Sequence, residues 1–142
     1  MPTSRAAPMR NPVIRFRIDF AANSCVGPGK IDLLEAIRDS GSLSQAARDL
    51  GMSYRRAWLL IDSFKEAFRE PVTSATTGGR GGGGVSLTKF GEGLIASYRA
   101  LERDFAKLAA RRLRLASAAV AGRTASMRPA SRRPLARRAA HL

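Results

Sequence analysis

The apolar positions between residues 41 and 58 repeat with the period of an α-helix, and they do so twice. The first run is spaced i, i+3, i+4 and i+7 and comprises Leu43, Ala46, Ala47 and Leu50. Gly51 can take the left-handed conformation that ends a helix, and Ser53 can cap the helix that follows. We expect an apolar stripe on this second helix, formed by Tyr54, Ala57, Trp58, Ile61, Phe64 and Phe68. Two short helices around a glycine turn predict a helix-turn-helix.

The residues before this motif predict one strand and one helix. Residues 13–20 alternate apolar and charged side chains, with Phe16, Ile18 and Phe20 on one side, which is typical of a half-buried strand. The Asn, the Pro and the two glycines of residues 21–29 predict a turn. From Lys30 onwards the apolar period becomes helical, and this helix is expected to end near Gly41.

A β-hairpin is predicted after the motif. The second helix should continue to about Glu70, because Pro71 blocks further helix growth. Residues 72–77 and 85–88 are rich in strand formers and flank a glycine-rich loop, so together they predict a wing. The loop contains G-x-G-x-x-G at residues 79–84, but a strand is expected after it. A dinucleotide site needs a helix there, and we therefore reject that interpretation.

A long helix is predicted over residues 89–118, with Thr88 as its N-cap. Its large apolar residues are spaced four and three apart, and this seam comprises Leu94, Tyr98, Leu101, Phe105 and Leu108. The early part of the seam is open to two interpretations, since it must also pack on the domain core. The small domain has little left to cover Phe105 and Leu108, so we expect a partner helix there and hence a homodimer.

The positive charge of the chain is concentrated near its C-terminus. The 142 residues carry a net charge of +14, of which residues 1–104 contribute +4 and residues 105–142, with 10 Lys and Arg and no acid, contribute +10. Such a segment favours polyanions, meaning nucleic acid or an anionic membrane surface. We predict a flexible arm at residues 1–12, a winged helix-turn-helix domain with its dimerisation helix at 13–118, and a disordered Arg-rich tail at 119–142. The predicted fold class is mainly α with a small β-hairpin.

No catalytic or metal-binding constellation is evident in the sequence. Cys25 is the single cysteine and His141 the single histidine, which argues against a disulfide framework, a cysteine zinc cluster and a catalytic triad. The acids, Asp32 and Glu35 among them, are interpreted as ordinary surface charge. No segment approaches the roughly 18 apolar residues of a membrane span. We expect a cytoplasmic, nucleoid-associated protein that is not an enzyme and has no metal and no membrane partner.

The second helix of the motif offers the best candidates for reading DNA. Arg55, Arg56 and Leu59 lie away from the expected apolar stripe, and an arginine can bind guanine O6 and N7 while a leucine can touch a thymine methyl. Trp58 is expected in the core, whereas Tyr54 can either pack or reach a phosphate. Hydroxyl and amide groups near the helix starts, and the arginine of the wing loop, suit phosphates. The residues expected to contact DNA are Ser44, Gln45, Ser53, Tyr54, Arg55, Arg56, Leu59 and Arg80.

Residues 41–58 resemble the N-terminal DNA-binding domain of the ModE-type molybdate-responsive regulators. Their Ser-Leu-Ser-Gln-Ala-Ala motif and Leu-Gly turn are also similar to those of LysR-type regulators. Residues 77–91 are similar to the glycine wing of the ModE type and to the Leu-Thr-x-x-Gly sequence with which its dimer helix begins. The resemblance covers about residues 13–110.

This resemblance implies a winged-helix dimer that binds palindromic operators, often at molybdate transport genes. It also implies molybdate sensing by C-terminal OB-like domains, but nothing after Leu115 has the sequence of a β-barrel, so we expect no molybdate domain and no cofactor in this chain. The predicted function is a sequence-specific DNA-binding transcriptional regulator. Two alternatives stay open: a non-specific architectural DNA-binding protein, and a heterodimer partner of a ligand-sensing regulator.

Overall fold

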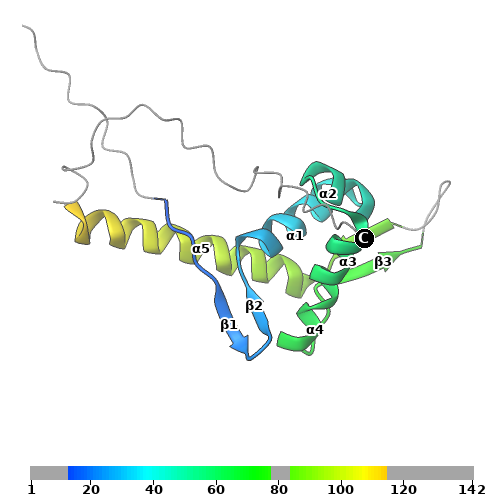
Figure 1. The fold of residues 1–142 in the computed structure, drawn as a ribbon, viewed down its shortest axis with the longest axis horizontal. Coiled ribbons are helices and arrows are strands. Elements are labelled where there is room, and N and C mark those ends of the chain that lie inside the picture. Colours follow the sequence, from blue (N-terminus) through cyan, green and yellow to red (C-terminus); the bar gives the residue numbers. More distant parts are fainter. Residues whose placement is uncertain (1–12, 78–83, 115–142) are drawn as a thin grey trace, which may run out of the picture.

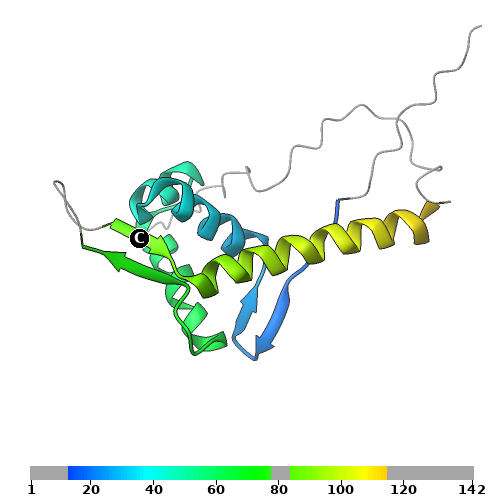
Figure 2. The same ribbon diagram turned by 180° about the vertical axis from the view of Figure 1, so that it is seen from behind.

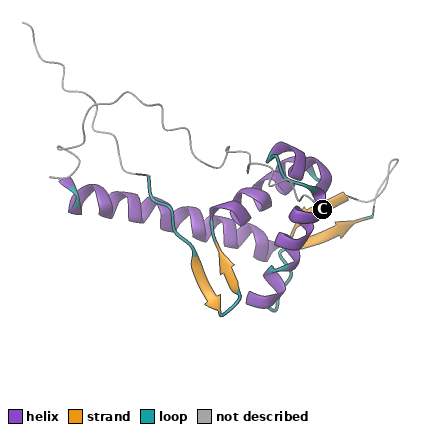
Figure 3. Ribbon diagram, viewed as in Figure 1, coloured by secondary structure: helices purple, strands orange, loops and turns teal. Residues whose placement is uncertain are grey.

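The computed structural model describes residues 13–77 and 84–114 and is mainly helical, as the sequence predicts, with two small antiparallel hairpins where the sequence predicts one (Figures 1 and 3). The predicted arm, the predicted tail and the wing loop with Arg80 lie outside the described residues. In chain order the elements are β1 (Ile18–Ala21), β2 (Ser24–Val26), α1 (Pro28–Ser40), α2 (Leu43–Asp49), α3 (Tyr54–Asp62), α4 (Phe64–Ala67), β3 (Thr73–Thr76), β4 (Gly84–Leu87) and α5 (Lys89–Arg112).

The first two strands form an antiparallel hairpin in which Ile18 pairs with Val26. The expected strand over residues 13–20 begins only at Ile18, and β2 occupies residues that the sequence assigned to a turn. That assignment was wrong because Ser24 and Val26 are two residues apart, so both face the core and both are buried. A serine, neighbouring glycines and a proline concealed this short strand in the sequence.

Serine hydroxyls cap both helices of the helix-turn-helix, and the cap at Ser53 was predicted. The Ser42 hydroxyl accepts a 3.2 Å hydrogen bond from the Gln45 N–H at the start of α2, and the Ser53 hydroxyl accepts one of 3.1 Å from the Arg56 N–H at the start of α3. Gly51 lies between the two helices with φ of 66°, in the left-handed region that favours glycine. These contacts fix where α3 begins.

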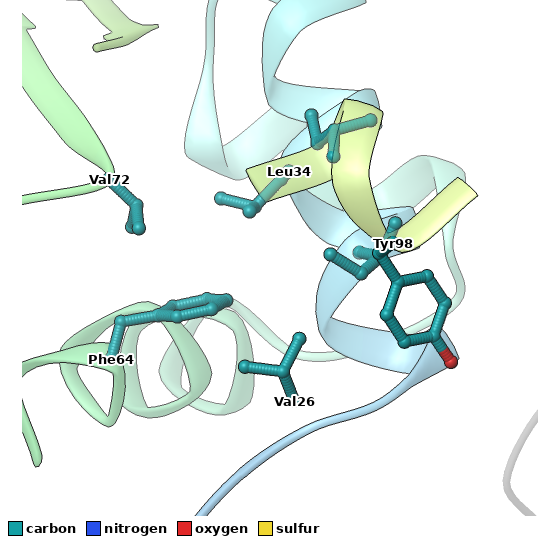
Figure 4. Close-up of a cluster of buried hydrophobic side chains, with 7 residues drawn as sticks. Val26, Leu34, Phe64, Val72 and Tyr98 are labelled. Carbon is teal, nitrogen blue, oxygen red and sulfur yellow. The ribbon is translucent and has the colours of Figure 1, made fainter. Parts of the chain in front are cut away.

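The second helix of the motif is shorter than the sequence predicts. α3 ends at Asp62, α4 is a single turn and Phe68 is extended, so the expected continuation to Glu70 was wrong. The Ser63 hydroxyl donates a 2.6 Å hydrogen bond to the Leu60 carbonyl, a local bond that competes with regular helical geometry. The break turns the buried Phe64 ring into the core (Figure 4).

The wing hairpin forms as predicted. The long helix begins at the predicted residue, Lys89, but α5 ends at Arg112, before the predicted end at residue 118. β3 and β4 pair antiparallel from Thr73 and Leu87 to Thr76 and Gly84. α5 then runs away from the helix-turn-helix, and its C-terminal half projects past the other helices (Figures 1 and 2). None of the helices in the described part of the chain is both long and apolar enough to span a membrane.

Two groups of buried side chains hold these elements together. One joins both hairpins, α1, α4 and α5, and comprises Val26, Ile31, Leu34, Phe64, Val72, Ile95 and Tyr98 (Figure 4). The other joins α1 to the helix-turn-helix and comprises Leu33, Ile37, Ala46, Ala47 and Ala57. Three of the latter are alanines, whose small side chains let α2 and α3 pack closely against α1.

Candidate nucleic-acid interface

The outer face of α3 is exposed along most of the helix. Its exposed side chains are Tyr54, Arg55, Arg56, Trp58 and Leu59. At about 100° per residue, Arg55 lies at the middle of this arc, with Trp58 and Tyr54 on one side and Leu59 and Arg56 on the other. All the residues that the sequence assigned to base contacts are therefore accessible on one helix face.

The position of Trp58 corrects the sequence prediction. Its side chain is 49% exposed, whereas it was expected at the centre of the buried stripe. The residue that faces α1 and α2 is Ala57, which is fully buried. The buried stripe predicted from the apolar residue types was too wide. Where α3 meets α1 and α2, the close packing has room for the methyl group of Ala57 and none for an indole. Tyr54, from the same predicted stripe, is 56% exposed.

The polar candidates already have partners within the motif. The Ser53 hydroxyl caps α3, and the side chain of Gln45 donates to Asp49 at 2.7 Å and accepts from Arg48 at 2.8 Å. Ser44 is exposed on the first turn of α2. Arg48 is an exposed cation that the sequence analysis did not single out, and it lies one turn from Gln45 on the same helix. The roles of these residues toward DNA remain predictions.

The base of the wing is fixed against the start of the helix-turn-helix. The Val85 N–H donates a 3.0 Å hydrogen bond to the Gly41 carbonyl, at the junction between α1 and α2. Gly84 makes this approach possible, since a Cβ there would lie 2.6 Å from the Thr76 hydroxyl and 2.9 Å from the Gly41 carbonyl. Wing and motif thus share one rigid junction. Arg80, the candidate at the wing tip, lies outside the described residues.

An ion-pair network that the sequence did not predict joins α5 to α1. The Arg99 guanidinium contacts Asp32 at 2.7 Å, Glu35 at 2.8 Å and Glu102 at 2.7 Å. The hydrogen bond from Arg99 lowers the pKa of Glu35, and its bond to Glu35 in turn raises the pKa of Arg99. Asp32 and Glu35 are therefore not ordinary surface charge. They fix how the long helix crosses α1.

The seam of α5 divides into a buried half and an exposed half. Tyr98 is 2% exposed, its ring stacks on Phe16 at 4.7 Å between centroids, and its hydroxyl donates a 2.6 Å hydrogen bond to the Phe16 carbonyl. Leu94 also packs against the core of its own chain. The expectation that Tyr98 lies in a dimer interface is corrected, because its side chain is used within the protomer.

The remaining seam residues are accessible. Leu101 is half-buried, while Phe105 and Leu108 are 38% and 40% exposed. Phe105 touches the edge of the Phe16 ring, with centroids 5.0 Å apart, so only part of its surface is covered. These three residues keep the spacing of four and three that a partner helix requires.

Comparison with known proteins identifies the domain that carries this geometry. Residues 29–92 match the family described as bacterial regulatory helix-turn-helix protein, lysR family. They form a LysR-type helix-turn-helix domain. The match begins in α1 and ends in the first turn of α5, so it contains the exposed face of α3 and the whole wing. The residues that the sequence assigned to a helix-turn-helix thus match a family of bacterial regulatory proteins, as predicted.

Curated relatives of the LysR-type domain confirm the resemblance to ModE-type proteins. The chain is 38% identical over 91 residues to the molybdenum transport protein ModE of Azotobacter vinelandii, covering 64% of this chain and 34% of the relative. It is 45% identical over 83 residues to the molybdenum-pterin-binding protein MopB of Rhodobacter capsulatus, covering 58% and 31%. It is 44% identical over 71 residues to the DNA-binding transcriptional dual regulator ModE of Escherichia coli, covering 50% and 27%. The chain thus matches about a third of the length of these relatives.

Proposed function

We propose that this chain is a sequence-specific transcriptional regulator of ModE type that binds a palindromic operator as a homodimer at molybdenum-related genes. The observation that carries the proposal is the exposed face of α3, which presents Arg55 and Arg56 on a helix whose first turn is capped by Ser53. The relatives named for molybdenum transport and for regulation support the class of target gene.

In this proposal α3 enters the major groove with its N-terminal turns. Arg55 lies at the middle of the exposed arc and Arg56 at its margin, so each can direct its guanidinium to a guanine in a different part of the groove. Leu59 lies between them and can touch a thymine methyl. Tyr54 is exposed at the first turn of α3, where its hydroxyl can reach the phosphate backbone.

Dimerisation is assigned to the projecting half of α5. Leu101, Phe105 and Leu108 form an apolar stripe that the rest of the described chain covers only in part. A second copy of α5, related by two-fold symmetry, would bury this stripe and set two α3 helices at a fixed spacing. A two-fold dimer reads a palindrome, with half-site centres about 10 base pairs apart or a multiple of that spacing.

DNA binding by these residues is proposed to need no cofactor. The groups that face the proposed DNA surface are arginines, hydroxyls and apolar side chains, which bind DNA directly. The presence or absence of molybdate should therefore leave the affinity of this chain for DNA unchanged.

The proposal is tested by selecting binding sites for the purified protein from a pool of random duplexes. The expected result is an enriched sequence with two inverted half-sites, bound by two copies of the chain and unaffected by added molybdate. Tight binding without enrichment would instead indicate a non-specific architectural protein. Enrichment that requires a longer ligand-sensing relative, with mixed dimers seen by native mass spectrometry, would indicate the heterodimer alternative.

A further inference from the structure

Trp58 is a large apolar side chain that the core does not use. The indole is 49% exposed, and Tyr54, one turn earlier on the same side of α3, is 56% exposed. Tryptophan is usually well buried, because its ring carries a large apolar area. Two adjacent aromatic side chains on the helix proposed to read DNA are therefore free to contact a partner outside the core.

The position of Trp58 indicates which partner it meets. On α3 the indole is about 60° around the helix from Arg55, so both side chains project from the same exposed face. The proposed dimer stripe lies on the projecting half of α5, at the other end of the molecule from α3 (Figures 1 and 2). Under the proposed function the exposed face of α3 lies in the major groove, so the indole lies there as well.

We propose that Trp58 is a specificity-determining residue whose indole packs against a thymine methyl group in each half-site. This inference rests on the proposed function. It adds a preference for thymine, which the arginines cannot supply because they bind guanine. The thymine methyl is the apolar group in the major groove, and an aromatic side chain is a suitable contact for it. Leu59 lies about 100° around the same helix from Trp58, so the two side chains would contact different base pairs.

The test uses the duplex selected by the protein itself. Each thymine is replaced in turn by uracil, which lacks only the methyl group, and binding is measured by fluorescence anisotropy of labelled DNA. For the wild-type protein we expect about a fourfold loss of affinity at one thymine of each half-site, the loss that removal of one buried methyl predicts.

Three variants show which side chain contacts that methyl group. Trp58→Ala should bind the unmodified duplex roughly tenfold more weakly and lose its sensitivity to uracil at that position. Leu59→Ala should keep the sensitivity. Leu113→Ala, which removes an equally exposed apolar side chain at the C-cap of α5, should bind like the wild type. A Trp58→Ala protein that responds to every uracil as the wild type does would overturn the proposal.

Fluorescence gives an independent readout because Trp58 is the single tryptophan of the 142-residue chain. Quenching of its emission by acrylamide should fall when the selected duplex is bound and stay higher on random duplex. Specific binding with unchanged quenching would overturn the role of Trp58 and leave the proposed function intact. If the protein shows no preference among sequences, the proposed function fails, and the role of Trp58 fails with it.

Discussion

Gly91, in the first turn of α5, lies directly against the backbone carbonyl of Val72, with no space for a Cβ between them. The two segments are joined again by the Thr88 N–H, which donates to the Val72 carbonyl at 3.1 Å, and by the Thr88 hydroxyl, which donates to the Pro71 carbonyl at 2.7 Å. The same hydroxyl caps α5 by accepting from the Gly91 N–H. The Leu-Thr-x-x-Gly sequence therefore clamps the start of α5 onto residues 71 and 72, which lead into β3.

Gly91→Ala should destabilise the fold, because the new methyl would meet backbone that cannot move aside. We expect a loss of about 1–3 kcal/mol in the free energy of unfolding, measured by urea denaturation. Gly93 is the matched control, since it lies in the same helix with open space around its Cα. Gly93→Ala should raise stability by about 0.5–1 kcal/mol through its helix propensity. Equal effects at the two positions would contradict the clamp.

Ser53 allows the capping role to be separated from DNA binding. Ser53→Ala should cost about 1 kcal/mol of stability, because the Arg56 N–H loses its side-chain acceptor. Ser53→Asp should keep the cap and the stability, since aspartate caps as well as serine. Its negative charge beside the phosphates should nevertheless weaken binding to every duplex. If Ser53→Asp binds DNA like the wild type in anisotropy measurements, Ser53 does not lie near the backbone.

The buried hydroxyl of Tyr98 predicts a loss of stability at high pH. Burial raises its pKa from 10 to about 12, so the folded state holds the phenolic proton where the unfolded state has released it. The contribution of Tyr98 is fully present below pH 10 and is lost as the pH rises towards 12, by at most about 3 kcal/mol.

Tyr98→Phe supplies the comparison for that measurement. At neutral pH the variant should be about 1 kcal/mol less stable, because the bond to the Phe16 carbonyl is absent. Between pH 10 and 12 the wild type should lose this advantage, as followed by urea denaturation at each pH. Parallel stability curves for the two proteins over that range would show that the Tyr98 hydroxyl is not buried in the folded state.

The projecting half of α5 should control the oligomeric state. Leu108→Glu places a charge in the proposed dimer stripe at a side chain that is 40% exposed in the protomer, so it should produce folded monomers. Leu113→Glu makes the same change at a more exposed leucine outside the stripe and should leave the dimer intact. Sedimentation equilibrium distinguishes the two outcomes. Identical masses for both variants would show that the stripe is not part of the dimer interface.

The local order of the fold could be predicted from the sequence, because capping residues and glycines act over a few positions. The turn at Gly51, the cap at Ser53 and the start of α5 at Thr88 were all predicted correctly. The strand Ser24–Val26 was missed, since its pairing with β1 is a tertiary contact that its own composition does not reveal. The residue types in each segment indicated whether it forms a helix or a strand. Which face of that helix or strand is buried depends on the other elements that pack against it.

At the candidate site, too, some residues could be placed from the sequence and others could not. Arg55 and Arg56 were placed on the outer face of α3 by helical period alone, and both are exposed. Trp58 was misplaced because a helical wheel does not show that the contact with α1 and α2 is filled by Ala57. Arg99 could not be predicted as a structural residue, since its partner Asp32 is 67 positions away in the chain.

Whether α3 reads a DNA sequence can be measured as the ratio of two affinities. The affinities are those of the full chain for its selected duplex and for a random duplex, measured at the same near-physiological salt concentration. We expect a ratio of about 10³ or more, as specific regulators show, and a lower ratio for Arg56→Ala. A ratio near one would show that the chain binds DNA through charge alone and that α3 does not read a sequence.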